Sequence, residues 1–170
     1  NKRAQSLTKR MILDEKVDVI QGAIASSERE AIRPIIDKHK QLYFYNVQYE
    51  GGVADKVTFC TGVIPEQQLI CAIQHANALY GPNVYCMILD YVSGHNTLGF
   101  VQATQSILGH KIVQHEIVPM SVSQFSSSIA RIQKAKPDWI LTWISGENHS
   151  QFFPQAYAAG LDIPMYSCIH

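Results

Sequence analysis

The order of apolar runs and polar turns between residues 17 and 49 constrains the fold more than any other feature of the sequence. An apolar run at 17–20 ends at Gly22, and the small polar segment 25–27 follows. A helical pattern of apolar positions then leads into a second apolar run at 42–45. This order predicts a strand, a turn, a helix and another strand. Ligands in open α/β sheets bind at the carboxyl ends of the strands, so the turns after both strands are candidate binding sites.

The same alternation continues through the rest of the chain. Apolar spacing and turn residues predict helices at about 3–15, 66–80, 95–108 and 149–159, a helix that carries Phe125, Ile129 and Ile132, and strands at 56–59, 84–89, 111–118, 138–143 and from 165. Strict alternation implies parallel sheets with right-handed crossovers. The predicted fold class is therefore α/β, with Rossmann-like parallel sheets and flanking helices, and further candidate ligand turns follow the strands that end at 89 and 143.

Composition narrows the class of function. Basic and acidic residues both number 14, so the net charge is zero, whereas nucleic acids and anionic membranes select clustered positive charge. We therefore expect no nucleic-acid partner. No apolar run approaches the roughly 18 residues of a membrane span. The four cysteines form no Cys-x-x-Cys pair, which predicts buried free thiols and slightly favours a reducing compartment.

The sequence offers no pattern typical of catalysis or metal binding. No Gly-x-Ser-x-Gly elbow places a nucleophile. His110 and His115 are five residues apart across an expected loop-to-strand boundary, which is a poor geometry for a metal. We therefore expect a binding protein, with no enzymatic activity, no cofactor and no metal.

Six short pieces, in order along the chain, resemble a known family. They are Gly22-x-x-x-Ser26-x-x-Arg29-x-Ala31-x-x-Pro34, Val47-Gln48-Tyr49-Glu50-Gly51, Asp90-Tyr91-Val92, Phe125-Ser126-Ser127, Ala135-Lys136-Pro137-Asp138 and Phe152-Phe153. Together they resemble the type I periplasmic-binding-protein fold, in its urea and short-chain-amide-binding branch related to the Leu/Ile/Val receptors. The second piece is the most specific to that branch.

The resemblance implies two lobes that close on a ligand about a hinge. It assigns residues 1–61 to part of the first lobe, 62–66 to the inter-lobe crossover and 67–170 to most of the second lobe. Family members are more than twice this length, so the resemblance also implies a fragment. An apolar edge left open at the strand 17–21 would favour a homodimer.

Residues that follow the first two strands are the ligand-binding candidates of the first lobe. Ser26 matches the position where amide-binding members present a hydroxyl from a helix N-terminus, and Ser26 or Ser27 is also a natural N-cap. Tyr45, Val47 and Gln48 follow the second strand. An aromatic wall beside an amide suits a small neutral polar solute. The alternative for Tyr45 is core packing with a satisfied hydroxyl.

The candidates of the second lobe follow the strands that end at 89 and 143. They are Asp90 and Tyr91 after one strand and Gly146 and Glu147 after the other, where Glu147 would face an amide nitrogen or remain a solvated turn carboxylate. The pair Ser93-Gly94 stands where relatives commonly carry an aromatic residue and a proline. This departure predicts less bulk in the pocket wall, and therefore a ligand larger than urea or a loss of binding.

These features together predict a receptor for urea or a short-chain amide that delivers its solute to an ABC permease. Such a receptor would be periplasmic, or extracellular and lipid-anchored. One alternative is a cytoplasmic amide-sensing regulator or a sensor ligand-binding domain of the same fold, acting on a regulatory partner. Another is a branched-chain amino-acid receptor.

Overall fold

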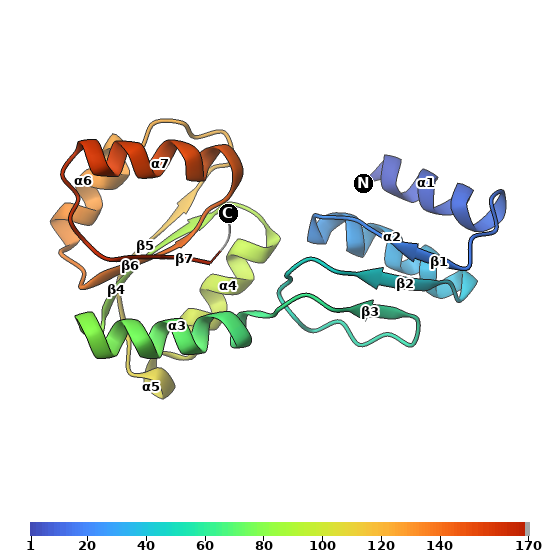
Figure 1. Ribbon diagram of the computed structural model, residues 1–170, viewed down its shortest axis with the longest axis horizontal. Coiled ribbons are helices and arrows are strands. Elements are labelled where there is room, and N and C mark those ends of the chain that lie inside the picture. The colour runs from blue at the N-terminus through green and yellow to red at the C-terminus, as the bar shows by residue number, and fades with distance from the viewer. Residues whose placement is uncertain (169–170) are drawn as a thin grey trace. The chain divides into compact units, whose positions relative to one another are not determined.

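The computed structural model describes residues 1–168. It divides the chain into two compact units, one spanning Asn1–Ile64 and one beginning at Pro65 (Figure 1). The first contains a three-stranded sheet and the second a four-stranded sheet, and the paired strands are parallel in both. The predicted α/β class with parallel sheets and flanking helices is confirmed.

The first unit has the strand order β1-β2-β3. Its elements are α1 (Lys2–Leu13), β1 (Val19–Gln21), α2 (Ser26–His39), β2 (Leu42–Tyr45) and β3 (Thr58–Cys60). Ile32 and Ile36 of α2 pack on Ile20, Tyr43 and Tyr45 of the sheet, and these five side chains form the core of the unit. Among the strands of residues 1–168, β1 pairs with β2 alone, so its other side is an edge of the sheet.

The N-terminus of α2 is closed by a carboxylate and not by a serine hydroxyl. Ala25 is the N-cap and Ser26 the first helical residue, so the predicted N-cap at Ser26 or Ser27 is wrong. The Glu28 carboxylate accepts hydrogen bonds from the backbone N–H groups of Ile24 and Ala25, at 3.2 and 3.3 Å. This is the contact that the glutamate of a capping box supplies. The Ser26 hydroxyl is consequently available to a partner outside the helix.

Helix α2 runs unbroken from Ser26 to His39, although Pro34 lies inside it. One prediction about the helices needs correction. The single helix predicted at 95–108 is divided at Thr104, whose hydroxyl donates to the carbonyl oxygen of Phe100 at 2.9 Å. Such a bond back into the preceding turn competes with regular helical pairing and bends the chain.

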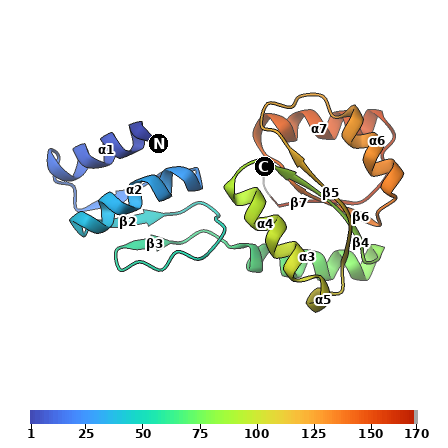
Figure 2. The same cartoon turned by 180° about the vertical axis from the view of Figure 1, so that it is seen from behind.

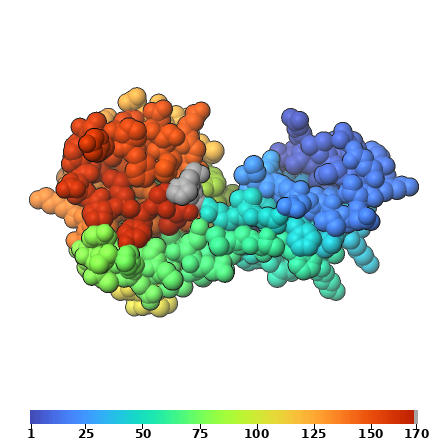
Figure 3. Space-filling view, viewed as in Figure 1, coloured from blue at the N-terminus to red at the C-terminus, as the bar shows by residue number. Residues whose placement is uncertain are grey.

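The second unit is a three-layer sandwich with the strand order β5-β4-β6-β7. Its elements are α3 (Pro65–Tyr80), β4 (Asn83–Leu89), α4 (Val92–Ala103), α5 (Gln105–Leu108), β5 (Lys111–Val118), α6 (Ser126–Ala135), β6 (Trp139–Trp143), α7 (Gly146–Ala158) and β7 (Met165–Ser167). Helices α3 and α4 cover one face of the sheet, and α6 and α7 cover the other (Figure 2). Viewed from the β7 edge, the unit presents α7 on one side of the sheet and α3 on the other (Figure 3).

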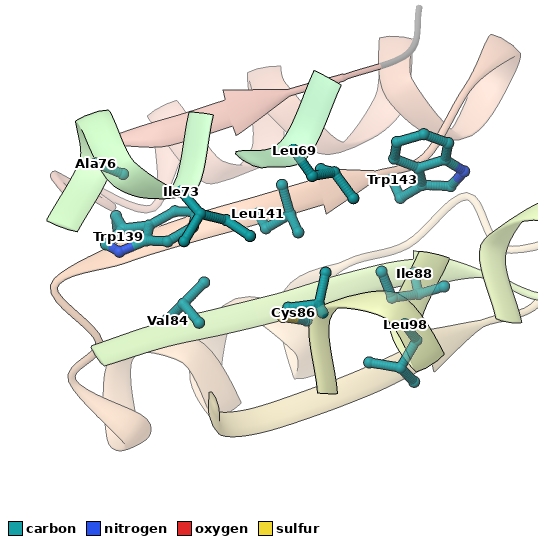
Figure 4. Packing of buried hydrophobic residues seen from close by; sticks show 11 residues of the cluster. Leu69, Ile73, Ala76, Val84, Cys86, Ile88, Leu98, Trp139, Leu141 and Trp143 are labelled. Atoms are coloured by element: carbon teal, nitrogen blue, oxygen red, sulfur yellow. The ribbon is translucent and has the colours of Figure 1, made fainter. Parts of the chain in front are cut away.

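The central strand β4 is buried on both faces, which explains its nearly continuous apolar sequence. Val84, Cys86 and Ile88 point toward α3 and α4 and pack with Trp139, Leu141 and Trp143 of β6 (Figure 4). The alternate residues of β4 point toward α6 and α7. The chain has two tryptophans, and both lie in β6, so their fluorescence reports on the folding of this unit.

The cysteines are free thiols, as predicted, although they are not all buried. Cys86 is buried in β4, and Cys60 and Cys168 are half-buried. Cys71 is exposed on α3, which contradicts the expectation of buried thiols for that position. Among residues 1–168, no helix is both long enough and apolar enough to cross a membrane.

We expect the second unit to lose stability as the pH falls below about 6.5, the ordinary pKa of histidine. His110 is 3% exposed, and its Nε2 lies 2.8 Å from the carbonyl oxygen of Val101. Burial lowers the pKa of His110, and the hydrogen bond to Val101 opposes this only in part. The unfolded chain therefore binds more protons than the folded chain as His110 titrates, so stability rises with pH through that range.

Thermal unfolding followed by tryptophan fluorescence, at about pH 7 and about pH 5, tests this prediction. The midpoint should fall on acidification, and it should fall less in His110→Gln, which takes up no proton. An equal fall in both proteins would show that His110 is not responsible.

Candidate functional site

The strand order of the second sheet creates a topological switch point between β4 and β6. From β4 the chain passes through α4 to β5, and from β6 it passes through α7 to β7 on the opposite side. These two helices cover opposite faces of the sheet (Figure 2). The loops after β4 and β6 thus diverge at the carboxyl edge, which is where open α/β sheets bind ligands.

Four of the predicted site residues lie at this edge. Asp90 and Tyr91 come directly after β4, and Gly146 and Glu147 form the first turn of α7. The N-caps of α4 and α7 make no side-chain capping hydrogen bond, so the first backbone N–H groups of both helices remain available as donors. Asp90 and Glu147 are exposed and add acceptors. The edge can therefore serve a small solute that has both a carbonyl group and N–H groups.

Sequence reasoning missed a histidine at the same edge. His95, in the first turn of α4, places its Nε2 2.7 Å from Oδ1 of Asp90. Both side chains are about half exposed, at 52% and 56%. The signal was present as an aspartate at the end of a strand and a histidine five residues later, in the first turn of the next helix.

Ser93 and Gly94 face the sheet and do not form a pocket wall. The Ser93 hydroxyl accepts a hydrogen bond from Nε1 of Trp143 at 3.3 Å, and both residues are buried. A Cβ atom at position 94 would lie 2.2 Å from the carbonyl oxygen of Leu89. The prediction that this pair widens the binding pocket is therefore wrong, because a larger side chain at 94 would collide with the backbone of β4.

In the first unit, the candidate site centres on a buried ion pair between α2 and the turn after β2. The Glu50 carboxylate accepts hydrogen bonds from the Ser26 hydroxyl, at 2.7 Å, and from Nη2 of Arg29. The Arg29 side chain is 1% exposed, and its guanidinium lies 4.9 Å from the ring centre of Tyr45 and 5.2 Å from that of Tyr49. This arrangement combines an ion pair with cation–π contacts.

Glu50 is held in its ionised form by these contacts. Burial alone would raise the pKa of Glu50, but the hydrogen bonds from Ser26 and Arg29 outweigh it and lower the pKa below its ordinary value. Sequence reasoning assigned no binding role to Glu50 or to Arg29. Both residues belong to the pieces that carry the family resemblance, which was the available signal.

The other predicted residues of the first unit differ in their exposure. Ser27 is exposed at the start of α2, and Val47 and Gln48 are half-buried in the turn after β2. Tyr45 has no exposed surface, and its hydroxyl donates to the carbonyl oxygen of Ile24 at 2.6 Å. Tyr45 is thus a core residue with a satisfied hydroxyl, and it does not offer its ring as a wall to a ligand.

The turn that carries these residues is fixed by its neighbour, the segment after β3. The Thr61 hydroxyl donates a hydrogen bond to the side-chain oxygen of Asn46 at 2.7 Å. The backbone N–H of Tyr49 donates to the carbonyl oxygen of Val63 at 3.1 Å. A Cβ atom at Gly62 would lie 2.1 Å from the carbonyl oxygen of Val47. Only glycine permits this approach.

Within residues 1–168, no group of three or more histidine, cysteine, aspartate or glutamate side chains is arranged to hold a metal ion. The side chains that gather at the candidate edges are instead hydroxyls, carboxylates, one imidazole and one guanidinium. They suit recognition of a polar organic solute by hydrogen bonding.

Two units, each with a parallel sheet and flanking helices, match the type I periplasmic-binding-protein fold. The chain belongs to the periplasmic binding protein domain family, whose profile matches residues 1–169. A search of curated protein sequences finds no match.

Solved structures of substrate-binding proteins share the fold at low sequence identity. An ABC transporter substrate-binding protein from Sphaerobacter thermophilus superposes with a TM-score of 0.85 at 20% identity, covering 98% of this chain and 48% of that one. An amino acid ABC transporter substrate-binding protein from Pseudomonas fluorescens gives 0.84 at 17%, covering 98% and 46%. A solute binding protein from Rhodopseudomonas palustris in complex with 3,4-dihydroxybenzoic acid gives 0.80 at 21%, covering 98% and 47%.

The chain spans about half the length of these structures. At such identities the similarity establishes the fold and not the ligand. The family and these structures are binding proteins and not enzymes, in agreement with the binding function expected from the sequence. The urea and amide branch is not established by these comparisons.

Proposed function

We propose that this chain is part of a solute receptor for an ABC importer and that its solute is urea or a short-chain amide. The observation that supports this most is the chemistry of the second unit's carboxyl edge. Backbone N–H groups of α4 and α7 lie there beside the exposed carboxylates of Asp90 and Glu147. An amide has a carbonyl oxygen for the donors and N–H groups for the acceptors, so each polar group can be paired.

In this proposal, residues 1–61 belong to one lobe, 67–170 to the other, and 62–66 to the crossover. Ser26, Ser27, Val47 and Gln48 contribute from the first lobe, and Asp90, Tyr91, Gly146 and Glu147 from the second. Closure about the hinge follows binding, because only the closed form pairs all the polar groups of the solute. The partner is an ABC permease, and the compartment is the periplasm or, for a lipid-anchored receptor, the cell exterior.

Carboxylate ligands are the main alternative. One solute binding protein of this fold, from Rhodopseudomonas palustris, has been solved in complex with benzoate, and another protein of this organism with the same fold is a branched-chain amino acid transporter. The helix N-termini of the second unit would attract a carboxylate, but Asp90 and Glu147 at the same edge would repel it. A neutral solute is therefore the better fit to these residues.

A regulator that senses amides in the cytoplasm is the other alternative. It would use the same binding edges to control a regulatory partner, and the free thiols are compatible with a reducing compartment.

A homodimer through the open edge of β1 also stays a prediction. A groove of about 450 Å³ lies between α1 and β1.

Calorimetric titration of the full chain with urea, acetamide, leucine and benzoate tests the proposed solute class. We expect saturable binding of urea or acetamide, with a dissociation constant of about 1 mM or below, and no comparable binding of the other two. Binding of leucine alone would indicate an amino-acid receptor, and binding of benzoate alone would indicate a receptor for aromatic acids. Either result would overturn the assignment to urea or amides.

A further inference from the structure

We propose that Glu50 is a positioning residue that fixes the hydrogen-bond polarity of Ser26, so that the Ser26 hydroxyl acts as an acceptor toward a bound solute. This inference rests on the proposed function, because it takes Ser26 to contact the solute. It goes further by stating which class of polar group Ser26 accepts, and by assigning that selectivity to a residue that does not itself need to touch the ligand.

The direction of the bond between Ser26 and Glu50 follows from their chemistry. An ionised carboxylate can only accept hydrogen bonds, so at 2.7 Å from Oε2 of Glu50 the Ser26 hydroxyl must donate. A hydroxyl has one proton and two lone pairs. With its proton committed to Glu50, Ser26 has only acceptor capacity left for another molecule.

The Glu50 carboxylate is held so that it cannot easily release Ser26. Its Oε1 accepts a hydrogen bond from Nη2 of Arg29, and its Oε2 accepts one from the Ser26 hydroxyl. Each carboxylate oxygen therefore has a separate donor. The side chains of Arg29 and Glu50 are only 1% and 9% exposed, and the Arg29 guanidinium lies against the rings of Tyr45 and Tyr49. The acceptor state of Ser26 is therefore set before any solute arrives.

A second carboxylate reinforces the same preference. Glu28 accepts hydrogen bonds from the N–H groups of Ile24 and Ala25, directly at the N-terminus of α2. Its negative charge offsets the positive end of the helix dipole. A solute N–H group at Ser26 would meet an acceptor near the Glu28 carboxylate, whereas a carboxylate oxygen would meet the lone pairs of Ser26 and the charge of Glu28. The charge of Glu50 is balanced by Arg29.

Acetamide and acetate are a matched pair of probes, because they share size and shape and differ in an NH₂ group against a charged oxygen. Titration of the full chain at about pH 7, where acetate is ionised, should show at least about tenfold tighter binding of acetamide, the ratio that about 1.4 kcal/mol represents. In Glu50→Gln the side-chain amide at position 50 can donate a hydrogen bond to the Ser26 oxygen. The Ser26 hydroxyl proton is then free to be donated to the solute. The preference should then shrink by about tenfold.

Glu30→Gln is the matched control. Glu30 also pairs with Arg29, at 2.9 Å, and its substitution removes the same charge from the same cluster, but it makes no contact with Ser26. The preference for acetamide should survive this change. An unchanged preference in Glu50→Gln, or an equal loss in both variants, would overturn the proposal.

Ser26→Ala keeps the Arg29–Glu50 pair and so provides a test if Glu50→Gln fails to fold. The proposal expects this variant to lose acetamide affinity and to keep or gain acetate affinity. The opposite pattern would overturn it.

A measurement without ligand separates this inference from the proposed function. Carboxyl NMR titration should show a higher pKa for Glu50 in Ser26→Ala than in the wild-type protein, since a donor to the ionised form is lost. An unchanged pKa would refute the bond direction even if acetamide binds. A raised pKa without binding of either probe would support the bond direction and refute the amide receptor.

Discussion

Replacing Arg29 with alanine is expected to lower the free energy of unfolding of the first unit by about 3–5 kcal/mol. Both members of the Arg29–Glu50 pair are nearly inaccessible to water, at 1% and 9% exposed. Removing the guanidinium leaves the Glu50 carboxylate buried without its counter-charge, and the penalty of such a group exceeds the value of the pair itself. The substitution also removes the cation–π contacts with Tyr45 and Tyr49.

Arg33→Ala is the control, one turn further along α2. Arg33 pairs with Asp55 at 2.7 and 3.0 Å, but both side chains are 26% exposed. A partly solvated pair contributes about 1 kcal/mol or less. Native-state hydrogen exchange at the amides of β2 reports on this unit directly. Equal losses of protection in the two variants would show that burial does not distinguish the two ion pairs.

Replacing Gly94 with alanine is expected to destabilise the second unit by about 1–3 kcal/mol or more. The added Cβ would lie 2.2 Å from the carbonyl oxygen of Leu89 and 3.0 Å from Cγ2 of Ile88. Backbone cannot move aside as a flexible side chain can, so α4 must shift away from β4. Tyr91 would shift with the start of the helix, and solute binding should weaken as well.

Gly99→Ala is the matched control within the same helix. A Cβ atom at position 99 meets nothing within 4 Å, and alanine is the better helix former, by about 0.5–1 kcal/mol. The two substitutions should therefore change stability in opposite directions. Chemical unfolding followed by tryptophan fluorescence measures both, because Trp139 and Trp143 lie in this unit. A neutral Gly94→Ala would mean that α4 packs less closely on β4.

The strands and helices could be predicted because their signals are local. The central strand β4 is a continuous apolar run, since parallel strands buried on both faces require one. Gly22, at which the first apolar run ends, has a positive backbone φ angle of 153°, which favours glycine. These patterns were sufficient for the fold class and for most of the element boundaries.

The details of the candidate site depend on contacts between distant residues, and local patterns do not report them. Glu50 meets Ser26 and Arg29 across 24 and 21 residues. The close packing of Gly94 on Leu89 depends on how α4 leaves the sheet. Ser26 shows the difficulty most clearly. Its residue type suggested an N-cap, but Ala25 is the N-cap, Glu28 supplies the capping hydrogen bonds, and the Ser26 hydroxyl donates to Glu50.

The most direct test of the account is calorimetric titration of the full chain with acetamide in the wild-type protein and in Ser26→Ala and Tyr91→Ala. Tyr157→Ala serves as the control, because Tyr157 is 89% exposed near the end of α7, remote from the carboxyl edge. We expect saturable binding in the wild type and the control, and affinity at least about tenfold lower in both edge variants, as loss of a paired polar contact predicts. Unchanged binding in both edge variants, or no binding of acetamide by the wild type, would contradict the account.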